Sequence, residues 1–586
     1  MTPNPNQANP DTHVRREIIA VSLLLALVSL LAWPGMHSRL MLDDLDQLNY
    51  VSTFTSWLDC FGKDSYGLFR PIKNIIFYSL ANQPPFAWHL LGLSLYLAVI
   101  PVIYLFLRRF LDSSLWAFIV LALWATSPTQ VSTAIWMSCA NISIAFLFTC
   151  ACLYFHDISQ AGSDRYYRST LLACLCLLLA QTSYETAIAV PALCVLIDAI
   201  RRRPLFTRQS MIRYALLAIV TLIYLGIRTY FSAIHSMNAD TRFIPDSPGW
   251  QISISAPWFL WKHFSMWLMP VGRIEILGTY LWGTSAAAWE LIVAWAWLLG
   301  MIGLIFYTWR RQPWIACGLL WFFATSFPSS NFIPIRVGPI ADYYLVFPSL
   351  GLAIALAGCA KALLAWYLSG GSNPKSSQKL ILGLTLFIGT TWRLLCLPLF
   401  WLQADLWSRP IELYVQCELT RTGQFHAQAL VANELLESGH LSEAKEFAMT
   451  SYETAPWFSG SSIVLGRVAF DNKDFIEAEK RFLDALQNSP EKTLLRDYCR
   501  YYLAYTYYSQ KEKRHLVRET LLDLLNNPLN TYHQSAILLL IECYISENKW
   551  EDALRAATKA TTLYPNDRKL AELLQKVKDK SQVSPP

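Results

Sequence analysis

The chain has 586 residues, of which 54% are hydrophobic and only 15% are charged. Soluble domains usually contain about 25% charged residues, so this composition excludes a wholly soluble protein. The formal net charge of +6 says little about partners, because apolar runs continue to about residue 400 and a polar segment follows them. The sequence therefore predicts a polytopic membrane domain followed by a soluble one.

The N-terminal segment, residues 1–17, is polar, and we expect a disordered cytoplasmic tail. The apolar run after it has no small-x-small cleavage site, so it is predicted to be an uncleaved first helix. Because a spanning helix needs about 20 largely apolar residues, residues 18–401 are predicted to form about eleven spans. These are Ile18–Met36, Phe86–Leu107, Ser114–Thr126, Val131–Phe155, Ser169–Thr182, Thr186–Ile200, Tyr214–Phe231, Ala286–Trp309, Trp314–Phe327, Tyr344–Leu368 and Leu380–Trp401.

Clusters of Lys and Arg in every second loop predict the orientation of these spans. Lys and Arg accumulate in cytoplasmic loops, so we expect the N-terminus inside. An odd number of spans then places the C-terminal domain outside. The clusters are Arg15–Arg16, Arg108–Arg109, Arg165 with Arg168, Arg201–Arg203 with Arg208, Arg310–Arg311 and Lys375 with Lys379.

Two outward loops are long, namely residues 37–85 and 232–285. The second loop contains SAPWFLWKHFSMWLMP, in which Trp258, Trp261 and Trp267 mix with Lys262 and His263. Aromatic rings among basic groups are typical of a helix that lies in the membrane interface. We expect such an interfacial helix, because a twelfth span would break the alternation of charge.

A connecting segment, residues 402–424, leads to a predicted repeat domain, residues 425–586. Ala444 and Ala478 are 34 residues apart, which is about the period of a tetratricopeptide repeat. Residues 498–530 fit the repeat poorly and are predicted to be a degenerate copy. The pattern predicts an α-solenoid whose default role is to bind a protein or peptide. Its template positions are Pro456, Gly466, Ala478, Phe482, Ala485 and Pro490, and in the last unit Tyr544, Ala553, Ala560 and Pro565.

The first outward loop carries acids and bases together. Asp43 and Asp44 open it in MLDDLDQLNY, and Arg70 and Lys73 follow in LFRPIKNIIFYSL. A carboxylate that accepts a proton beside cations that bind a phosphate suits an enzyme with a lipid-phosphate donor. On charge alone, a solvated loop of mixed charge is the alternative, and Asp46 is assigned to such a loop or to a helix cap.

Five regions of the apolar part carry short motifs in a fixed order, and the repeats follow them. They resemble the transmembrane and tetratricopeptide-repeat-containing O-mannosyltransferases, which are polytopic glycosyltransferases of the GT-C class. The resemblance covers nearly the whole chain, and it implies an all-α fold of GT-C type with the repeats on the outer side of the membrane. The motifs are LDDLDQLNY with LFRPIKNIIFY, FAWHLLGLSLYL, LWATSPTQVSTAIWMSCANISIAFLF, QTSYETAIAVPALCVLID and SNFIPIRVGPIADYYLVFPSLG.

The chain departs from the family pattern at several ionisable positions. These departures predict a divergent relative. A bacterial inner membrane is favoured over the endoplasmic reticulum membrane, because the single N-glycosylation sequon, at Asn141, lies inside a predicted span. Ser127-Pro128 and Gln130 stand where the family has His-Pro and a following His, and Ser138–Asn141 stand where it has Gly-Arg-Ala and an acidic residue. Tyr184 replaces the Lys of a Lys-Glu pair, and Tyr343 replaces an Arg.

The resemblance implies that a carboxylate of the first loop acts at the reacting centre. Asp43 aligns with the first acid and is predicted to be the general base that takes the proton of an acceptor hydroxyl, an effect worth about 10²–10⁴ in rate. Asp44 aligns with the second acid and is predicted to orient the base. Both could instead bind a divalent cation, Mg²⁺ or Mn²⁺, although two acids in sequence are a thin ligand set.

The leaving group would be a polyprenyl phosphate, whose charge arginine binds through two hydrogen bonds. Arg393 lies inside the last predicted span, where a charge costs about 2.5–3.5 kcal/mol, so we expect a buried partner for it. For Arg228, snorkelling to the interface is an equally good interpretation. The candidate phosphate-binding residues are Arg70, Lys73, Arg228, Arg336 and Arg393.

Three more residues complete the predicted substrate site. His89 is expected to contact substrate or to cap an interface. Glu185 stands at the outer start of a span, where it meets an arginine or faces water. Asp342 takes a matching outer position, with a helix N-cap as its alternative.

These features predict an integral membrane glycosyltransferase that moves a sugar from a polyprenyl-phosphate donor to a hydroxyl on the outer face. A protein Ser or Thr, presented with help from the repeats, is the expected acceptor, and a lipid or polysaccharide is the alternative. We expect no nucleic-acid partner. The main rival hypothesis is a non-catalytic membrane scaffold whose repeats recruit partner proteins. A transporter is less favoured, because the hydropathy shows no symmetric halves.

Overall fold

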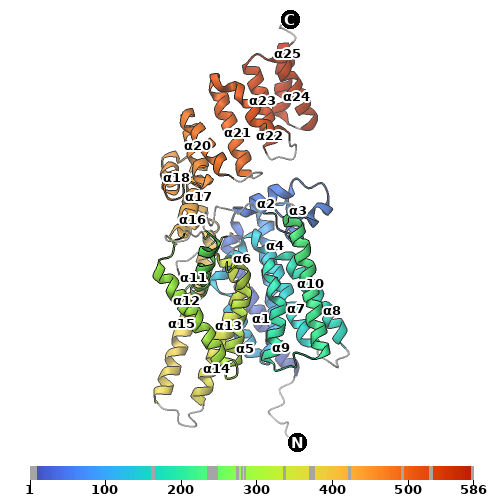
Figure 1. Ribbon diagram of the computed structural model, residues 1–586, viewed down its shortest axis with the longest axis vertical. Coiled ribbons are helices and arrows are strands. Elements are labelled where there is room, and N and C mark those ends of the chain that lie inside the picture. Colours follow the sequence, from blue (N-terminus) through green and yellow to red (C-terminus); the bar gives the residue numbers. More distant parts are fainter. Residues whose placement is uncertain are drawn as a thin grey trace. The chain divides into compact units, whose positions relative to one another are not determined.

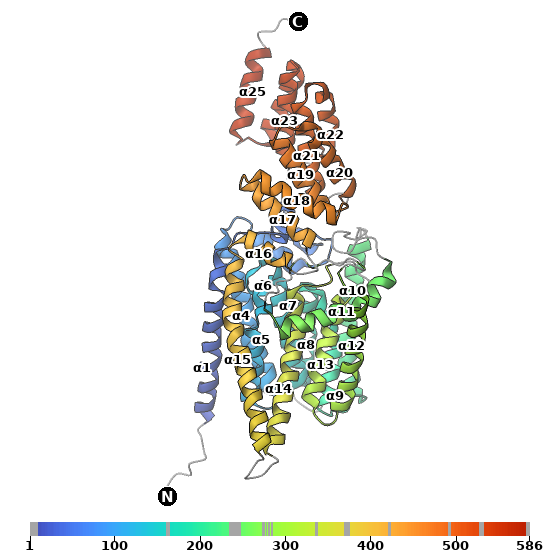
Figure 2. The ribbon, with the colours of Figure 1, turned by 90° about the vertical axis from the view of Figure 1, so that its left-hand side faces the viewer.

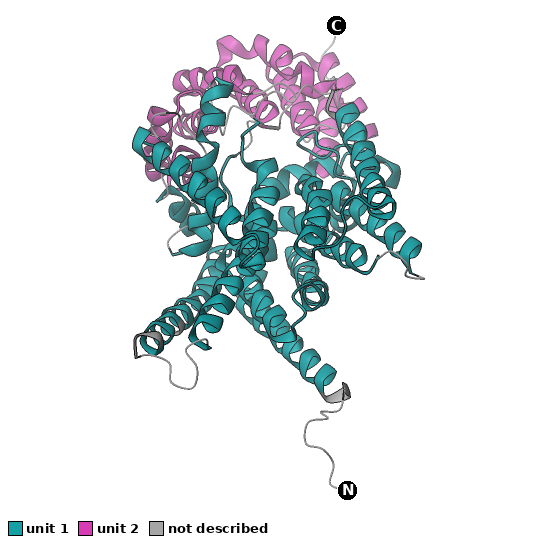
Figure 3. Cartoon of the chain, turned by 60° about the horizontal axis from the view of Figure 1, so that its bottom comes forward, with its two compact units in different colours: residues 1–423 teal, residues 424–586 magenta. Residues whose placement is uncertain are grey.

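The computed structural model describes residues 10–159, 165–233, 248–271, 285–333, 338–368, 376–419, 424–489, 494–526, 532–565 and 567–581, with residues 276, 278 and 282. These residues form an all-helical protein, apart from one isolated bridge between Lys63 and Phe69. The chain divides into two compact units, Met1–Gly423 and Gln424–Pro586 (Figure 3). The second unit thus begins one residue before the predicted repeat domain.

The first unit is built from long helices joined by short ones (Figure 1). In chain order it contains α1 (Pro10–Ala32), η1 (Trp33–His37), α2 (Asp43–Val51), η2 (Trp57–Phe61), α3 (Pro71–Leu80), α4 (Pro85–Phe110), α5 (Ser114–Ala125), η3 (Pro128–Gln130), α6 (Val131–Ile135), η4 (Met137–Cys139), α7 (Ala140–Ile158), α8 (Tyr166–Ser183), η5 (Glu185–Ala189), α9 (Val190–Ile200), α10 (Arg208–Ala233), α11 (Gly249–Leu268), α12 (Ala288–Thr308), α13 (Pro313–Ser326), η6 (Phe327–Ser329), η7 (Asp342–Leu345), α14 (Val346–Leu368), α15 (Ser376–Leu406) and α16 (Pro410–Glu418).

Seven helices in the described part of the chain are long and apolar enough to cross a membrane. An eighth span results if the bent pair Ser114–Ala125 and Pro128–Ile135, which meets at 66°, is counted as one. All seven coincide with predicted spans, and the protein is a membrane protein by this criterion. They are His13–His37, Pro85–Phe110, Met137–Ile158, Arg208–Phe231, Ala288–Thr308, Asp342–Leu368 and Lys379–Leu406.

Three further predicted spans form shorter or less apolar helices. The helices α8, α9 and α13 have 18, 11 and 14 residues. At about 1.5 Å per residue, α9 and α13 are shorter than the roughly 30 Å hydrocarbon core of a bilayer. Composition alone made these segments look like complete spans, whereas in the fold they pack against longer neighbours such as α7 and α14.

Glycines allow α13 and α14 to approach each other closely. A Cβ atom on Gly318 would lie 2.3 Å from the carbonyl oxygen of Gly351, and a Cβ on Gly351 would lie 2.6 Å from the carbonyl oxygen of Gly318. Small residues at such crossings let helix backbones touch inside a membrane. Elsewhere in this unit, α15 packs against α1 (Figure 2).

The predicted interfacial helix corresponds to α11, but its tryptophans are not all at the surface. Trp258 and Trp267 are buried within the protein, and Trp261 is half-buried. Burial of these rings against neighbouring helices leaves less aromatic surface for lipid headgroups than the composition predicted.

The second unit is a succession of helices in which each packs on the next. Small side chains permit this packing: a Cβ on Gly466 would lie 2.8 Å from the ring of Phe482, and Ala478 and Ala553 are completely buried. The helices are α17 (Gln424–Glu437), α18 (Leu441–Thr454), α19 (Ser459–Asp471), α20 (Phe475–Asn488), α21 (Leu494–Ser509), η8 (Lys511–Leu516), α22 (Val517–Leu525), α23 (His533–Ser546), α24 (Trp550–Leu563) and α25 (Arg568–Ser581). This unit is therefore a series of packed helices, which is compatible with the predicted repeats.

Candidate functional site

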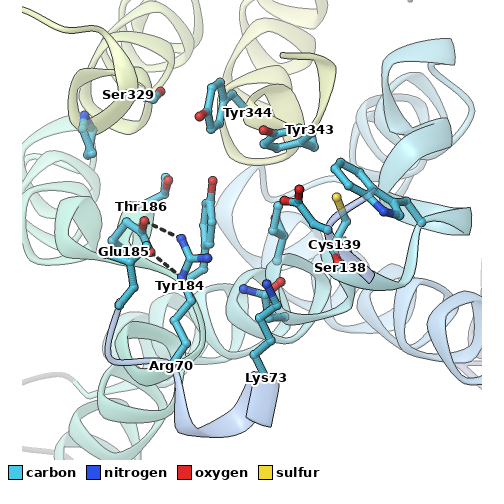
Figure 4. A pocket seen from close by; sticks show the side chains of 16 residues that line it. Arg70, Lys73, Ser138, Cys139, Tyr184, Glu185, Thr186, Ser329, Tyr343 and Tyr344 are labelled. Carbon is cyan, nitrogen blue, oxygen red and sulfur yellow. Dashed lines mark hydrogen bonds and ion pairs between the residues drawn. The ribbon is translucent and has the colours of Figure 1, made fainter. Parts of the chain in front are cut away.

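A cavity of about 120 Å³ lies among the short helices of the first unit. It gathers residues from six separate segments, and Tyr343 and Tyr344 lie across it from Arg70 and Lys73 (Figure 4). The cavity brings together four of the predicted site residues: Asp43, Arg70, Lys73 and Glu185. Its lining residues are Asp43, Leu68, Arg70, Lys73, Trp136, Ser138, Cys139, Asn141, Ile142, Tyr184, Glu185, Thr186, Pro328, Ser329, Tyr343 and Tyr344.

In the segment 37–85, the two short α-helices α2 and α3 are joined by hydrogen bonds of buried amide side chains. Gln47 on α2 donates a hydrogen bond of 2.9 Å to the side-chain oxygen of Asn74 on α3. Asn74 in turn donates to the carbonyl oxygens of Cys60 and Lys63, at 3.0 and 2.9 Å. These bonds hold the acidic start of α2 and the basic start of α3 in one rigid piece.

Arg70 is the centre of an ion-pair cluster. It binds the Glu185 carboxylate in the two-pronged manner, with its Nη2 2.6 Å from Oε1 and its Nε 3.1 Å from Oε2. Its Nη1 lies 3.3 Å from Asp64 Oδ2, and its guanidinium lies 5.1 Å from the centre of the Tyr184 ring. Arg228 Nη1 lies 3.7 Å from the same Oε2 atom. Sequence reasoning left open whether Glu185 meets an arginine, and the structure gives it two.

The arginines keep Glu185 ionised despite its burial. Burial alone would raise the pKa of this carboxyl, but Arg70 and then Arg228 outweigh burial and lower the pKa to about 2. Removal of Arg70 would therefore leave a carboxylate with only one distant cation. The pair is thus a structural connection between the first loop and η5 as well as a feature of the cavity.

Lys73 is buried but lines the cavity. Its Nζ lies 4.0 Å from Asp64 Oδ2 and 5.3 Å from the centre of the Tyr66 ring. Asp64, which sequence analysis did not single out, is itself buried and accepts hydrogen bonds from the backbone of Tyr66 and Leu68. The signal that could have identified it is its place in the same loop, six residues before Arg70.

The two adjacent acids of α2 have different environments. Asp44 is buried, and its Oδ1 accepts hydrogen bonds from the Ser138 backbone and hydroxyl at 2.7 and 2.6 Å. Asp43 lines the cavity, and its carboxylate has no hydrogen-bond or ion-pair partner among the residues that the structure describes. Of these two acids, Asp43 is thus the one that is placed to receive a proton from a molecule in the cavity.

A metal-ion role for these acids remains a prediction. In the described ranges, no group of three or more His, Cys, Asp or Glu side chains is arranged to hold a metal ion. Asp43 and Asp44 would have to be completed by other ligands, because the Asp44 carboxylate is turned toward Ser138.

Five of the described residues that were predicted for the site do not line the cavity: Asp44, Arg228, His89, Asp342 and Arg393. His89 bridges the carbonyl oxygens of Ser38 and Ile135, each at 2.9 Å. Asp342 accepts a 2.5 Å hydrogen bond from the Ser132 hydroxyl.

Arg393 binds the carbonyl oxygen of Ala122, at 2.7 Å, and the Thr126 hydroxyl at the end of α5. Arg393 therefore provides hydrogen bonds to the C-terminal end of α5 and not to a ligand. The fourth predicted phosphate-binding arginine, Arg336, lies outside the described residues.

Tyrosines form much of the remaining wall. Tyr184 and Tyr343, which stand where the resembled family has Lys and Arg, both line the cavity beside Tyr344. The sequence showed only the loss of charge at these positions, because nothing in it indicated that the replacements share a wall.

The cavity offers the Asp43 carboxylate, which has no partner in the described part of the chain, together with a buried ammonium group and aromatic surface. It can therefore accept a proton next to a bound anion. No family model matches the chain, and no match to a curated protein was found. The chemistry of the site therefore has to be argued from its geometry.

Proposed function

We propose that the protein is an integral membrane glycosyltransferase of GT-C type that transfers a sugar from a polyprenyl-phosphate donor to a hydroxyl acceptor. One observation carries the proposal. The cavity combines Asp43, Lys73 and Arg70 from the first loop with Glu185 and a tyrosine wall, in a domain of apolar helices.

In the proposed reaction the acceptor oxygen attacks the anomeric carbon of the sugar. Asp43 takes the proton of the acceptor hydroxyl as the new carbon–oxygen bond forms. The bond between the anomeric carbon and the phosphate oxygen breaks, and its electron pair leaves with the phosphate. No oxidant or further reactant is required.

Lys73 is proposed to stabilise the departing phosphate. Its ammonium is 4.0 Å from Asp64, which leaves it more weakly paired than Arg70. Low local polarity strengthens an interaction between a buried ammonium and a phosphate. Arg70 supplies the second positive charge, held in place by Glu185 and Asp64.

The size of the cavity limits what it can hold. A cavity of about 120 Å³ is close in size to the roughly 150 Å³ cavity that accepts one benzene molecule. This is room for a phosphate and the attacking hydroxyl, so the lipid chain and most of the sugar must lie outside it.

The orientation of the chain, the number of spans and the type of helical repeat are part of the same proposal. We place the cavity at the outer face, with the N-terminus in the cytoplasm and some of the shorter helices contributing to about eleven spans. The helical repeats of the second unit are proposed to be tetratricopeptide repeats that present a protein acceptor. Support comes from the basic clusters and from Gly466 and Ala478 at packing positions of the repeat template.

Transfer from a labelled lipid-linked sugar, measured with purified full-length protein, tests the proposal. Asp43→Asn should reduce turnover by about 10²–10⁴, and Lys73→Met should also reduce it, because the leaving phosphate loses its cation. Asp46→Asn, on the same helix but not in the cavity lining, is the matched control and should keep wild-type turnover. Equal turnover in Asp43→Asn and wild type would refute the assigned base.

A non-catalytic scaffold is the second candidate function. The observation that favours it is that Arg70 is already fully engaged by Glu185 and Asp64. The same assay separates the two hypotheses. A scaffold gives no turnover in the wild type, and its partner binding is unchanged by Asp43→Asn.

A further inference from the structure

A second cavity, of about 390 Å³, lies where α4 and α9 end and α13 begins. Its volume falls in the range of about 300–1,000 Å³ that is usual for ligand pockets. It is lined by Phe110, Asp112, Ile200, Arg201, Arg203, Pro313 and Trp314. None of these residues belongs to the proposed transferase site.

The arginines of this cavity belong to a network with more cations than carboxylates. Asp157, which is buried, is shared by Arg109, by Arg201 at 3.3 Å and by Arg203 at 2.8 Å. A single carboxylate neutralises one of these three charges.

The neighbouring buried carboxylate, Asp198, does not remove the excess. It pairs with Arg203 and Arg213, at 3.0 and 3.1 Å, and with His156 at 3.0 Å. The two buried aspartates therefore face four arginines, and positive charge remains at the cavity wall.

The remaining carboxylate of the cavity offers little compensation. Asp112 lies 3.7 Å from Arg201 Nη2, but its side chain is 81% exposed, so solvent screens the pair. Lys361 adds a further cation, since its Nζ lies 3.9 Å above the Trp314 ring.

The cavity lies at one end of membrane helices. It is formed by the C-terminal end of α9 and the N-terminal end of α13, whereas Glu185 and Ser329 of the first cavity adjoin the other ends of these two helices. With 14 residues, α13 separates the two sites by about 21 Å along its axis. Arginine and tryptophan side chains at the ends of membrane helices are the ones that contact phosphate groups at a membrane surface.

We propose that this second cavity binds a phosphate group, with Arg201 and Arg203 as its ligands and Trp314 packing beside it. The phosphate belongs to an anionic lipid headgroup or to a soluble phosphate. Arginine donates paired hydrogen bonds to phosphate oxygens.

Binding is measured on the full-length protein in detergent, with native mass spectrometry for phosphatidylglycerol and phosphatidylcholine and titration calorimetry for inorganic phosphate. We expect retention of phosphatidylglycerol over phosphatidylcholine. Arg201→Gln should weaken that binding by about tenfold or more, since a hydrogen bond to a charged group is lost. Asp112→Asn should change it by less than about twofold, because the Asp112 side chain is exposed and solvent screens its charge.

Arg202→Gln is the matched control, because Arg202 is the exposed neighbour of Arg201 and does not line the cavity. If Arg202→Gln weakens binding as much as Arg201→Gln does, general surface charge explains the result and the proposal is overturned. It is also overturned if the wild-type protein retains phosphatidylcholine as well as phosphatidylglycerol and binds no inorganic phosphate, a readout that needs no variant. Binding of inorganic phosphate with the same variant pattern supports the site and identifies a soluble ligand.

Discussion

At the scale of single residues, Asp44 shows how burial and hydrogen bonding compete. Burial raises the pKa of the Asp44 carboxyl to about 7, although the hydrogen bonds from Ser138 lower it. The folded protein thus holds a proton that the unfolded chain releases above about pH 4. The contribution of Asp44 to the free energy of unfolding is fully present below about pH 4, and it is lost as the pH rises through about 7.

We therefore predict that the thermal unfolding midpoint of the wild type falls as the pH rises from 5 to 7. The free energy of unfolding should decrease by up to about 1.4 kcal/mol per pH unit. Asp44→Asn keeps an acceptor oxygen for Ser138 and should remove most of this slope, whereas Asp46→Asn should keep it. Scanning calorimetry at several pH values measures the difference, and parallel curves for wild type and Asp44→Asn would contradict the assignment.

The sequence could place Asp43, Asp44, Arg70 and Lys73 in one loop, because they are close along the chain. It could not separate the two acids, since their difference depends on Ser138, which is 94 residues away from Asp44. For the same reason Asp64 was overlooked: its importance comes from burial beneath two cations, which no local pattern reveals.

At the scale of helices, the contact of α13 with α14 depends on Gly318 and Gly351. An added methyl group at Gly351 would collide with backbone atoms of α13, which cannot rotate away as a flexible side chain can. Apolar runs predicted both helices, but only the tertiary structure shows that their glycines meet. The seven long spans were predictable for a simpler reason, because length and apolarity alone define them.

Gly351→Ala is predicted to destabilise the membrane domain by about 1–3 kcal/mol, the usual cost of overpacking. Gly303→Ala on α12 is the control, because a Cβ there would meet nothing within 4 Å. It should be neutral or slightly stabilising, since alanine favours helix by about 1 kcal/mol over glycine. Thermal unfolding in detergent compares the two variants, and equal midpoints would show that the helices can separate without cost.

At the scale of the whole molecule, the second unit has its own hydrophobic cores. One surrounds Phe482 and Leu521, and another joins Ile537 and Ile541 of α23 to Ala557, Ala560 and Leu570. Repeat proteins gain stability from each interface between neighbours, and their terminal helices cover the last apolar face. The sequence predicted this domain from the spacing of small residues, although residues 498–530 matched the template poorly.

Residues 424–586 produced alone are predicted to be soluble and helical and to unfold cooperatively, as circular dichroism would show. A shorter fragment, residues 424–546, lacks α24 and α25 and leaves Ile537 and Ile541 exposed. We expect this fragment to aggregate in size-exclusion chromatography. Monomeric behaviour of the shorter fragment would mean that the last two helices do not protect the unit.

The Arg70–Glu185 pair has one more consequence for the proposed reaction. An incoming phosphate that draws on Arg70 must compete with a carboxylate already in place, so binding becomes an exchange of counterions. The net gain is then the difference between two strong interactions, and it grows as the singly charged phosphodiester of the donor becomes the doubly charged departing phosphate. Arg228, 3.7 Å from Glu185, is positioned to receive the displaced carboxylate, so the spent lipid phosphate can be released as the original pair forms again.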